Sequence, residues 1–221
     1  MNTKPRKDIA FFDIDKTIIS INSGEALIRQ AYRNGFLNTL GLLKAIYTGL
    51  QYKYNSKDSH NIIKKMGSWL AGHSEEEIGT ISKDIFSKDI IPSIRPNIIK
   101  EINELKKEST EVVILSSAIS AICIPLGQHL NMDAVICSEL EVEAGKFTGK
   151  PVGNFCFRDE KLVRLKDFCQ KRNFRLENAA YYADAIDDLP VLEAVGFPEC
   201  VCPDKKLSKV AQERGWRIEN W

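Results

Sequence analysis

Two carboxylates lie two residues apart near the N-terminus, directly after a short apolar run. The segment reads Asp13-Ile-Asp15-Lys-Thr17, and the run before it covers residues 8–13. A carboxylate at the end of a strand can attack an electrophile, and a second one nearby can transfer the proton that the reaction needs. Thr17 can hold the loop by hydrogen bonds to backbone or carboxylate groups. Because paired aspartates are also common in turns, the motif predicts catalysis only together with partners elsewhere in the chain.

A second acidic group predicts a divalent cation. Asp184, Asp187 and Asp188 lie within five residues of each other. Placing them beside Asp13 and Asp15 would be unfavourable without a bound positive charge, because like charges repel. Oxygen ligands with no histidine or cysteine nearby favour a hard ion, and Mg²⁺ suits phosphate chemistry. The structural alternative is that Asp187 and Asp188 complement the N-terminus of the helix that follows them.

Two further groups can hold a phosphoryl oxygen. Ser116 and Ser117 follow the β-branched run at 111–115, where a hydroxyl and a backbone N–H can bind an anion. Lys161 begins a helical segment at 160–172 and can neutralise a phosphoryl group or the nucleophile. Each has a simpler alternative: a strand-end turn for the serines, and a solvated surface side chain for the lysine.

Parallel strands are expected to bring these residues together. Four apolar runs are continuous rather than alternating, which is typical of strands covered on both faces. They lie at 8–13, 111–116, 179–184 and 199–202. Helical segments follow the last three, at about 119–130, 188–195 and 204–214. This order predicts an α/β fold with a doubly wound parallel sheet, in which polar residues at the strand ends converge on one crevice.

The interval between the first two strands predicts a separate helical unit. Residues 20–92 contain helical patterns and no clear strand, and Ser74-Glu-Glu-Glu77 is a capping-box sequence. Gly35 and the stretch 55–58 predict breaks between helices. An all-helical insert at this point of the chain would lie over the crevice as a cap.

The expected domain boundaries follow from this insert. We expect a core of residues 1–19 and 93–221, and a helical cap of residues 20–92. Within the core we expect a helix at about 97–108 and a β-hairpin at about 139–148, with Ala144-Gly145 at its turn.

The segment 36–47 is unusually apolar. We interpret it as part of the hydrophobic core of the cap. The alternative is a surface for a membrane or for an amphiphilic phosphate such as a lysophospholipid.

Taken together, these pieces resemble the four motifs of the haloacid dehalogenase superfamily of phosphohydrolases. The matching positions are DxDxT at 13–17, a strand-ending Ser116, Lys161, and the acidic pair Asp184 and Asp188. The similarity extends to the subfamily IB that includes phosphoserine phosphatase. It includes the run Ala-Asp-Ala-Ile-Asp-Asp-Leu-Pro-Val-Leu-Glu-Ala-Val-Gly at 183–196 and the position of the cap, and it covers essentially the whole chain. It implies a Rossmann-like core.

The resemblance also implies roles for the aspartates. Asp13 would be the nucleophile, and its side chain would also bind Mg²⁺. Asp15 would be the general acid/base and would lend its backbone carbonyl to the metal. Asp184 would be a direct metal ligand, and Asp188 a ligand or the support of one.

The remaining roles concern the phosphoryl group and the substrate. Ser116 and Lys161 would hold the phosphoryl group, with Ser117 beside them. Relatives that act on phosphoserine usually carry a cap glutamate at the position of Asn22, so Asn22 is the expected substrate contact here and phosphoserine itself is not favoured. The fourth motif reads Ala-Asp-Ala at 183–185, where relatives usually carry Gly-Asp-Gly or Gly-Asp-Ser.

Composition excludes several other classes of protein. The chain has 221 residues, with 31 Lys and Arg against 30 Asp and Glu and a net charge of +1, which argues against a nucleic-acid binder. It shows no signal-peptide pattern and no apolar stretch long enough to span a membrane. Six cysteines without metal-binding spacing fit reduced thiols in a cytoplasmic protein. The expected partner is a small phosphorylated metabolite, and the sequence leaves the oligomeric state open.

Two other functions use the same residue types. A phosphotransferase would pass the group from Asp13 to an alcohol instead of water. A receiver-like signalling domain would take up one phosphoryl group without turnover, but the second carboxylate at Asp15 and the 73-residue insert at 20–92 argue against it.

Overall fold

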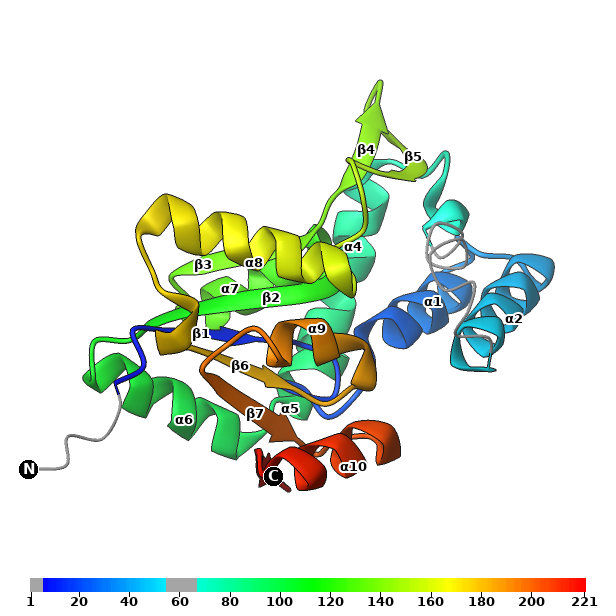
Figure 1. The fold of residues 1–221 in the computed structure, drawn as a ribbon. Helices are drawn as coiled ribbons and strands as arrows, with labels where there is room; N and C mark the ends of the chain where they lie inside the picture. Colours follow the sequence, from blue (N-terminus) through cyan, green and yellow to red (C-terminus); the bar gives the residue numbers. More distant parts are fainter. Residues whose placement is uncertain (1–5, 55–66) are drawn as a thin grey trace, which may run out of the picture.

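Six parallel strands form the central sheet (Figure 1). They appear in a computed structural model that describes residues 6–54 and 67–221, with the side chains of residues 49–54 left undescribed. The strand order is β3-β2-β1-β6-β7-β8, and every neighbouring pair is parallel. The strands are β1 (Ile9–Phe12), β2 (Glu111–Ile119), β3 (Ala134–Ser138), β6 (Ala179–Ala183), β7 (Phe197–Val201) and β8 (Arg217–Glu219).

Helices cover both faces of the sheet, so the predicted doubly wound architecture is confirmed. Side chains alternate along β1, with Ile9 and Phe11 on one face and Ala10 and Phe12 on the other, and all four are fully buried. The Ile9 face packs against α8, α9 and α10, and the Ala10 face packs against α6 and α7. These helices are α6 (Pro96–Lys107), α7 (Ser120–His129), α8 (Asp159–Arg172), α9 (Leu189–Leu192) and α10 (Lys205–Arg214).

The sheet is wider than the sequence predicted. Neither β3 nor β8 was predicted. β8 has three residues, two of them charged, and so contains no apolar run, whereas β3 (Ala-Val-Ile-Cys-Ser) is an apolar run as long as β6 and was missed. β2 also extends past the predicted end at Ser116 to Ile119. Its register with β3 shifts between Leu115 and Ile119, so the regular ladder is interrupted where the two serines lie.

The chain between β1 and α6 is helical, as predicted, in the part that the structure describes. The Ser74–Glu77 capping box is present, with the Ser74 N–H donating to the Glu77 carboxylate at 2.7 Å and the Glu77 N–H donating to Ser74 Oγ at 3.1 Å. Gly35 ends the first helical unit with a φ of 75°, whereas the predicted break at 55–58 lies outside the described residues. The elements are α1 (Ser23–Arg33), α2 (Thr39–Tyr54), the 3-10 turn η2 (Ser68–Leu70), α4 (Glu75–Ile85), the π-helical turn η3 (Phe86–Ile90) and α5 (Ile91–Ser93).

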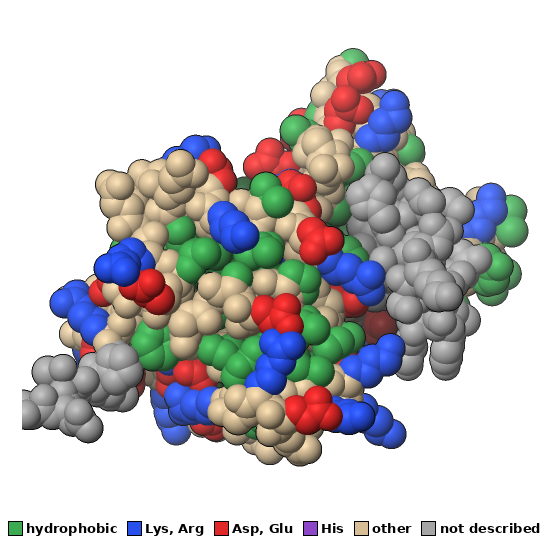
Figure 2. All heavy atoms as spheres, viewed as in Figure 1, with side chains coloured by type: hydrophobic (Ala, Val, Ile, Leu, Met, Phe, Trp, Pro, Cys, Tyr) green, Lys and Arg blue, Asp and Glu red, His purple; other side chains and the backbone are tan. Residues whose placement is uncertain are grey.

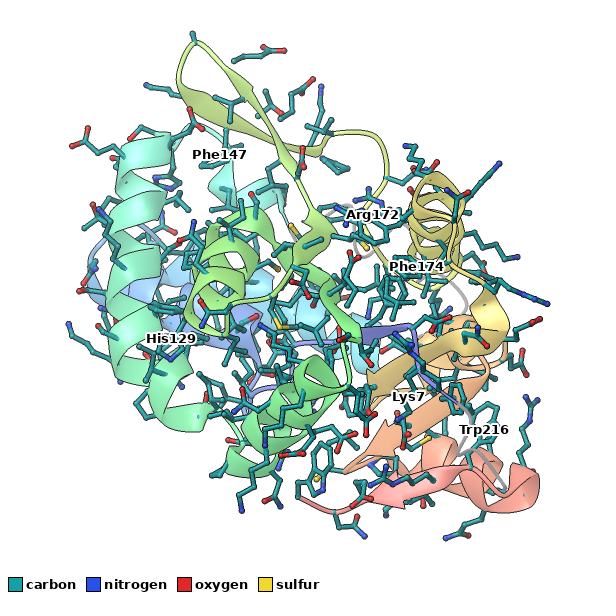
Figure 3. The ribbon with its side chains drawn as sticks, turned by 90° about the vertical axis from the view of Figure 1, so that its left-hand side faces the viewer. Lys7, His129, Phe147, Arg172, Phe174 and Trp216 are labelled. Atoms are coloured by element: carbon teal, nitrogen blue, oxygen red, sulfur yellow. The ribbon has the colours of Figure 1, made fainter. Side chains whose placement is uncertain are left out.

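The predicted β-hairpin is present, and it joins this helical segment. Its strands are β4 (Leu140–Glu143) and β5 (Lys146–Pro151), and both turn residues have positive φ, 50° at Ala144 and 75° at Gly145. Phe147 on β5 forms two backbone hydrogen bonds with the chain before α4: Gly72 donates to it at 2.8 Å, and it donates to His73 at 2.9 Å. Figure 3 shows Phe147 on the projecting hairpin. The hairpin therefore packs with the helical segment although it follows β3 in sequence.

Interpreting residues 36–47 as buried core is wrong for one face of α2. Leu37 is 7% exposed and belongs to the core, but Leu40, Leu43 and Tyr47 are 62%, 57% and 63% exposed. Helical periodicity spaces these three residues along one side of α2. The segment is apolar on both sides, so apolar composition alone did not show which side would be covered.

Candidate active site

The carboxylate of Asp13 lies at the carboxyl end of the central strand. Its backbone N–H donates to Tyr182 O at 3.0 Å and so prolongs the pairing of β1 with β6. Because Ile9 and Phe11 face α8, the alternation along β1 directs the next odd-numbered side chain, Asp13, to that face as well. Its carboxylate is 2.8 Å from Lys161 Nζ, at the first turn of α8. The strand and the helix together place this pair.

Lys161 is buried and binds three groups at once. Its Nζ donates to Asp13 at 2.8 Å, to Asp188 at 2.6 Å and to the Tyr181 hydroxyl at 3.0 Å. Burial alone would lower the pKa of Lys161, but the carboxylates of Asp13 and Asp188 hold it well above its ordinary value. The alternative of a solvated surface lysine is therefore wrong, and a fixed positive charge lies beside Asp13.

Three buried carboxylates form a cluster at this point. Asp13, Asp184 and Asp188 each place one carboxylate oxygen within 4.8 Å of the other two. Burial, reinforced by the neighbouring carboxylates, raises the pKa of Asp184 to about 8. Burial also raises the pKa of Asp188 to about 6, in spite of its bond to Lys161. The raised pKa values of Asp184 and Asp188 show that burial without a cation disfavours their charged forms. A cluster of carboxylate oxygens is the donor set that a hard divalent ion prefers.

Asp15 lies outside this carboxylate cluster and has a different partner. Its carboxylate accepts the backbone N–H of Ser23 at 2.9 Å, at the start of α1. Burial raises its pKa to about 6, with the charge of Asp13 acting in the same direction and the Ser23 hydrogen bonds opposing it. A carboxyl group with a pKa near neutrality can give up and take back a proton during one reaction cycle.

The predicted phosphate-binding serines lie on the neighbouring strand at the same edge. Phe12 pairs with Ile114 across β1 and β2, so Ser116 lies level with the first residues after β1. Ser116 is 1% exposed and its hydroxyl accepts the Ala118 N–H at 3.3 Å, while Ser117 is exposed. The structure thus places one buried and one exposed serine beside the end of β1.

Asp187 differs from its two acidic neighbours. It accepts a hydrogen bond from Arg158 Nε at 2.7 Å, so its partner is a side chain just before α8 and not the carboxylate cluster. Asp188 is the N-cap residue of α9, so its charge lies at the N-terminus of that helix as the structural alternative predicted, but its side chain makes no hydrogen bond to the helix and instead accepts one from Lys161. Arg158 was not predicted from the sequence, and no motif marks it.

Tyr181 was also missed, although alternation along β6 places it on the face that α8 covers. Asn22, the predicted substrate contact, has a structural role: its Oδ1 accepts the Glu25 N–H at 2.9 Å and caps α1. Thr17 is fully buried, and its hydroxyl lies 3.5 Å from an oxygen of Asp184. Thr17 therefore holds the loop after β1 through a carboxylate, as predicted, and the carboxylate belongs to the loop after β6.

Comparison with known proteins agrees with this geometry. The family model of haloacid dehalogenase-like hydrolases matches residues 10–193. A protein named probable phosphatase Rv3661 from Mycobacterium tuberculosis is 30% identical over 98% of this chain and 76% of its own length. The histidinol-phosphatase of Neisseria meningitidis is 28% identical over 97% of this chain and 99% of its own length.

A solved structure shares the fold. It is described as a phospho-aspartyl intermediate analogue of phosphoserine phosphatase, and it superposes with a TM-score of 0.71 at 18% identity, covering 96% of this chain and 92% of its own. The chain belongs to the haloacid dehalogenase-like hydrolases, as a phosphoric monoester hydrolase similar to phosphoserine phosphatase.

Proposed function

We propose that this protein is a Mg²⁺-dependent phosphatase that hydrolyses a small phosphomonoester through a phosphorylated Asp13. The observation that carries the proposal is the buried contact of Asp13 with Lys161 at 2.8 Å, inside a cluster of three carboxylates. The side chains of Asp13, Asp184 and Asp188 and the backbone carbonyl of Asp15 would hold the metal. When bound, the ion would neutralise charge on the phosphoryl oxygens and orient them.

The side chains of this chain would divide the chemistry between them. A carboxylate oxygen of Asp13 attacks phosphorus and the bond to the alcohol oxygen breaks, while Asp15 gives that oxygen its proton. Asp15 then takes a proton from water, and the resulting hydroxide attacks the phosphorus of phospho-Asp13. The bond between phosphorus and the Asp13 oxygen breaks, which restores the carboxylate and releases phosphate. Lys161 holds the Asp13 carboxylate by its 2.8 Å hydrogen bond before the attack and balances the phosphoryl charge afterwards.

Other residues would position the substrate. We propose that Ser116, with Ser117 beside it, holds phosphoryl oxygens together with Lys161. Residues 20–92 would act as a cap over a core of residues 1–19 and 93–221. Asn22 would contact the substrate from that cap, through the amide nitrogen that its capping bond leaves available.

The cap would also decide which metabolite is hydrolysed. Relatives are named histidinol-phosphatase and phosphoserine phosphatase, and we propose a small phosphorylated metabolite of this kind as substrate. All six cysteines are free thiols, which supports our proposal that the protein acts in the cytoplasm. Among the described residues, no helix is both long and apolar enough to cross a membrane.

Turnover of an aryl phosphate tests the mechanism. We expect Asp13→Asn to reduce release of nitrophenol from p-nitrophenyl phosphate by at least about 10³-fold, because the amide oxygen is a poor nucleophile. Asp187→Asn is the matched control, since that carboxylate bonds to Arg158 outside the cluster, and it should retain most of the activity. EDTA should silence the wild type and Mg²⁺ should restore it. Wild-type turnover by Asp13→Asn, or full activity in EDTA, would contradict the proposal.

A further inference from the structure

Charge is unevenly distributed along the chain, and one segment has no acidic residue. Between Glu25 and Asp58 there is no aspartate or glutamate in 32 residues, although the whole chain has 30 in 221. The same segment holds five basic residues, and four of the six tyrosines of the protein. The basic residues are Arg29, Arg33, Lys44, Lys53 and Lys57, and the tyrosines are Tyr32, Tyr47, Tyr52 and Tyr54.

The helix α2, within this segment, presents an apolar stripe to solvent. The stripe consists of Leu40, Leu43, Ile46 and Tyr47, which are 62%, 57%, 50% and 63% exposed. The opposite side of the segment is used for packing, since Leu37 is buried and Leu42 packs against the same core cluster. Large apolar side chains that are exposed singly are ordinary on a protein surface, but these four lie in consecutive turns of one helix and form a continuous apolar patch. Such patches are typical of interaction sites.

Exposed basic residues lie within the stripe and just before α2 in the chain. Lys44 is exposed within it, and Arg33 is exposed in the last turn of α1, next to α2 in sequence. Arg29 on α1 is engaged in an ion pair with Asp89 at 2.8 Å, so it contributes less. Figure 2 shows hydrophobic and basic side chains together at the outer edge of the molecule, over the α1–α2 part of Figure 1. A surface that is apolar and basic, with no acidic residue in its own segment, complements a surface that is apolar and anionic.

We propose that the outward face of α2, together with Lys44 and Arg33, binds the surface of an anionic lipid bilayer. Leu40, Leu43 and Ile46 enter the boundary between headgroups and acyl chains. Tyr47 lies at the level of the headgroups, where its ring is buried and its hydroxyl is hydrated. The basic side chains contact anionic headgroups.

A bilayer fits this face better than a second copy of the chain. In a symmetric dimer the same patch of both copies would form the interface. The two Lys44 side chains would then lie close together, and the segment 26–57 has no carboxylate that could balance their charge. Lysine is also depleted from the centres of protein interfaces, whereas lysine beside leucine and tyrosine is typical of helices that lie on membranes. The binding is independent of phosphate chemistry, since none of these residues belongs to the carboxylate cluster.

Cosedimentation with lipid vesicles tests the proposal. We expect the full-length wild type to bind vesicles that contain about 40% phosphatidylglycerol at least about tenfold more tightly than pure phosphatidylcholine vesicles, with affinity falling as salt rises. Leu43→Glu should weaken binding at least about tenfold, since it places a negative charge in the stripe. The matched control is Val163→Glu on α8, where a valine is 58% exposed, and it should bind as the wild type does.

A second pair of variants tests the charge without touching the apolar side chains. Lys44→Glu should weaken binding to anionic vesicles, whereas Lys166→Glu on α8, also at an exposed position, should not. Asp13→Asn should bind vesicles normally, so loss of phosphatase activity and loss of membrane binding are separable. Circular dichroism checks that each variant is folded.

Three results would overturn the proposal. The first is failure of the wild type to bind anionic vesicles. The second is equal binding by Leu43→Glu and Val163→Glu. The third is a wild-type dimer in sedimentation velocity that Leu43→Glu converts to monomer, which would show that the stripe is covered by a second copy of the chain.

Discussion

Replacing Asp184 by asparagine should make the metal-free protein more stable while it inactivates the enzyme. Asp184 is 7% exposed and lies beside Asp13 and Asp188. Burial and those two carboxylates raise its pKa from 3.8 to about 8. Asparagine has nearly the same shape and no charge in either state, so Asp184→Asn removes the electrostatic cost without opening a cavity. The same change removes a carboxylate from the proposed metal site.

The size and the sign of this effect follow from the pKa. Because the folded-state pKa lies above the unfolded value of 3.8, Asp184 costs the metal-free wild type no stability below about pH 4, and the cost grows as the pH rises to about 8. At pH 7 the pH lies about 3 units above the pKa of Asp184 in the unfolded state. At about 1.4 kcal/mol for each unit, burying Asp184 lowers the free energy of unfolding by about 4 kcal/mol. At pH 5 the same arithmetic gives a cost of about 1–2 kcal/mol. Water entering the cleft reduces both values, so we expect a gain for Asp184→Asn of about 2–4 kcal/mol at pH 7 and a smaller gain at pH 5.

Urea denaturation in EDTA measures this difference, with Asp187→Asn as the control. Asp187 lies three residues away in the same loop, but it is paired with Arg158. Breaking that partly exposed pair should lower the free energy of unfolding by up to about 1 kcal/mol. Asp184→Asn should therefore raise the free energy of unfolding, whereas Asp187→Asn should lower it. With Mg²⁺ at about 100 times its dissociation constant, the wild type should gain about 2.7 kcal/mol and Asp184→Asn much less. A loss of stability in Asp184→Asn at pH 7, or a gain that does not grow with pH, would refute the electrostatic reasoning.

Two further predictions concern the proton transfer and the packing behind the site. Because burial raises the pKa of Asp15 to about 6, single-turnover release of the alcohol should slow as the pH rises above 6. Asp15→Asn should lower the rate about 10²–10⁴-fold and abolish that pH dependence. A pH profile that is unchanged in the variant would exclude Asp15 as the acid. Gly196→Ala should destabilise the fold by at least about 2 kcal/mol in thermal unfolding, since the new Cβ would lie 1.9 Å from the carbonyl oxygen of Glu177. Gly79→Ala, in α4 with no atom within 4 Å of its Cβ, should instead be neutral or stabilise by up to about 1 kcal/mol.

The strand ends that carry chemistry could be predicted from the sequence because each ends a continuous apolar run. The runs before Asp13 and Asp184 are fully buried in β1 and β6, and parallel pairing brings both carboxylates to one edge. At these strand ends the local pattern and the tertiary position have the same cause, the burial of a strand on both faces. The role of Lys161 was implied by the family resemblance, because a lysine at the start of a helix is by itself also typical of a solvated surface position.

Other features depend on contacts that no local pattern reveals. Asp187 and Asp188 are adjacent and chemically identical, yet the turn η5 (Ile186–Asp188) directs one to Arg158 and the other to Lys161. The choice between them depends on the direction of each side chain within a single turn. The exposure of α2 was missed for a related reason: a helix that is apolar on both sides has no periodic signal to show which side is covered.

The charges of the site imply an order of binding. Asp13 and Asp188, when ionised, carry two negative charges, of which Lys161 offsets one, while Asp184 stays protonated below its pKa of about 8 until a metal binds and then adds a third negative charge. A phosphomonoester brings up to two more negative charges, so the metal-free cleft repels its own substrate. A divalent cation would bring the net charge of the three ionised carboxylates and Lys161 to zero. The phosphoryl group could then approach Asp13 without net repulsion. We therefore expect the metal to assist substrate binding as well as phosphoryl transfer, so the Michaelis constant as well as kcat should depend on Mg²⁺ concentration.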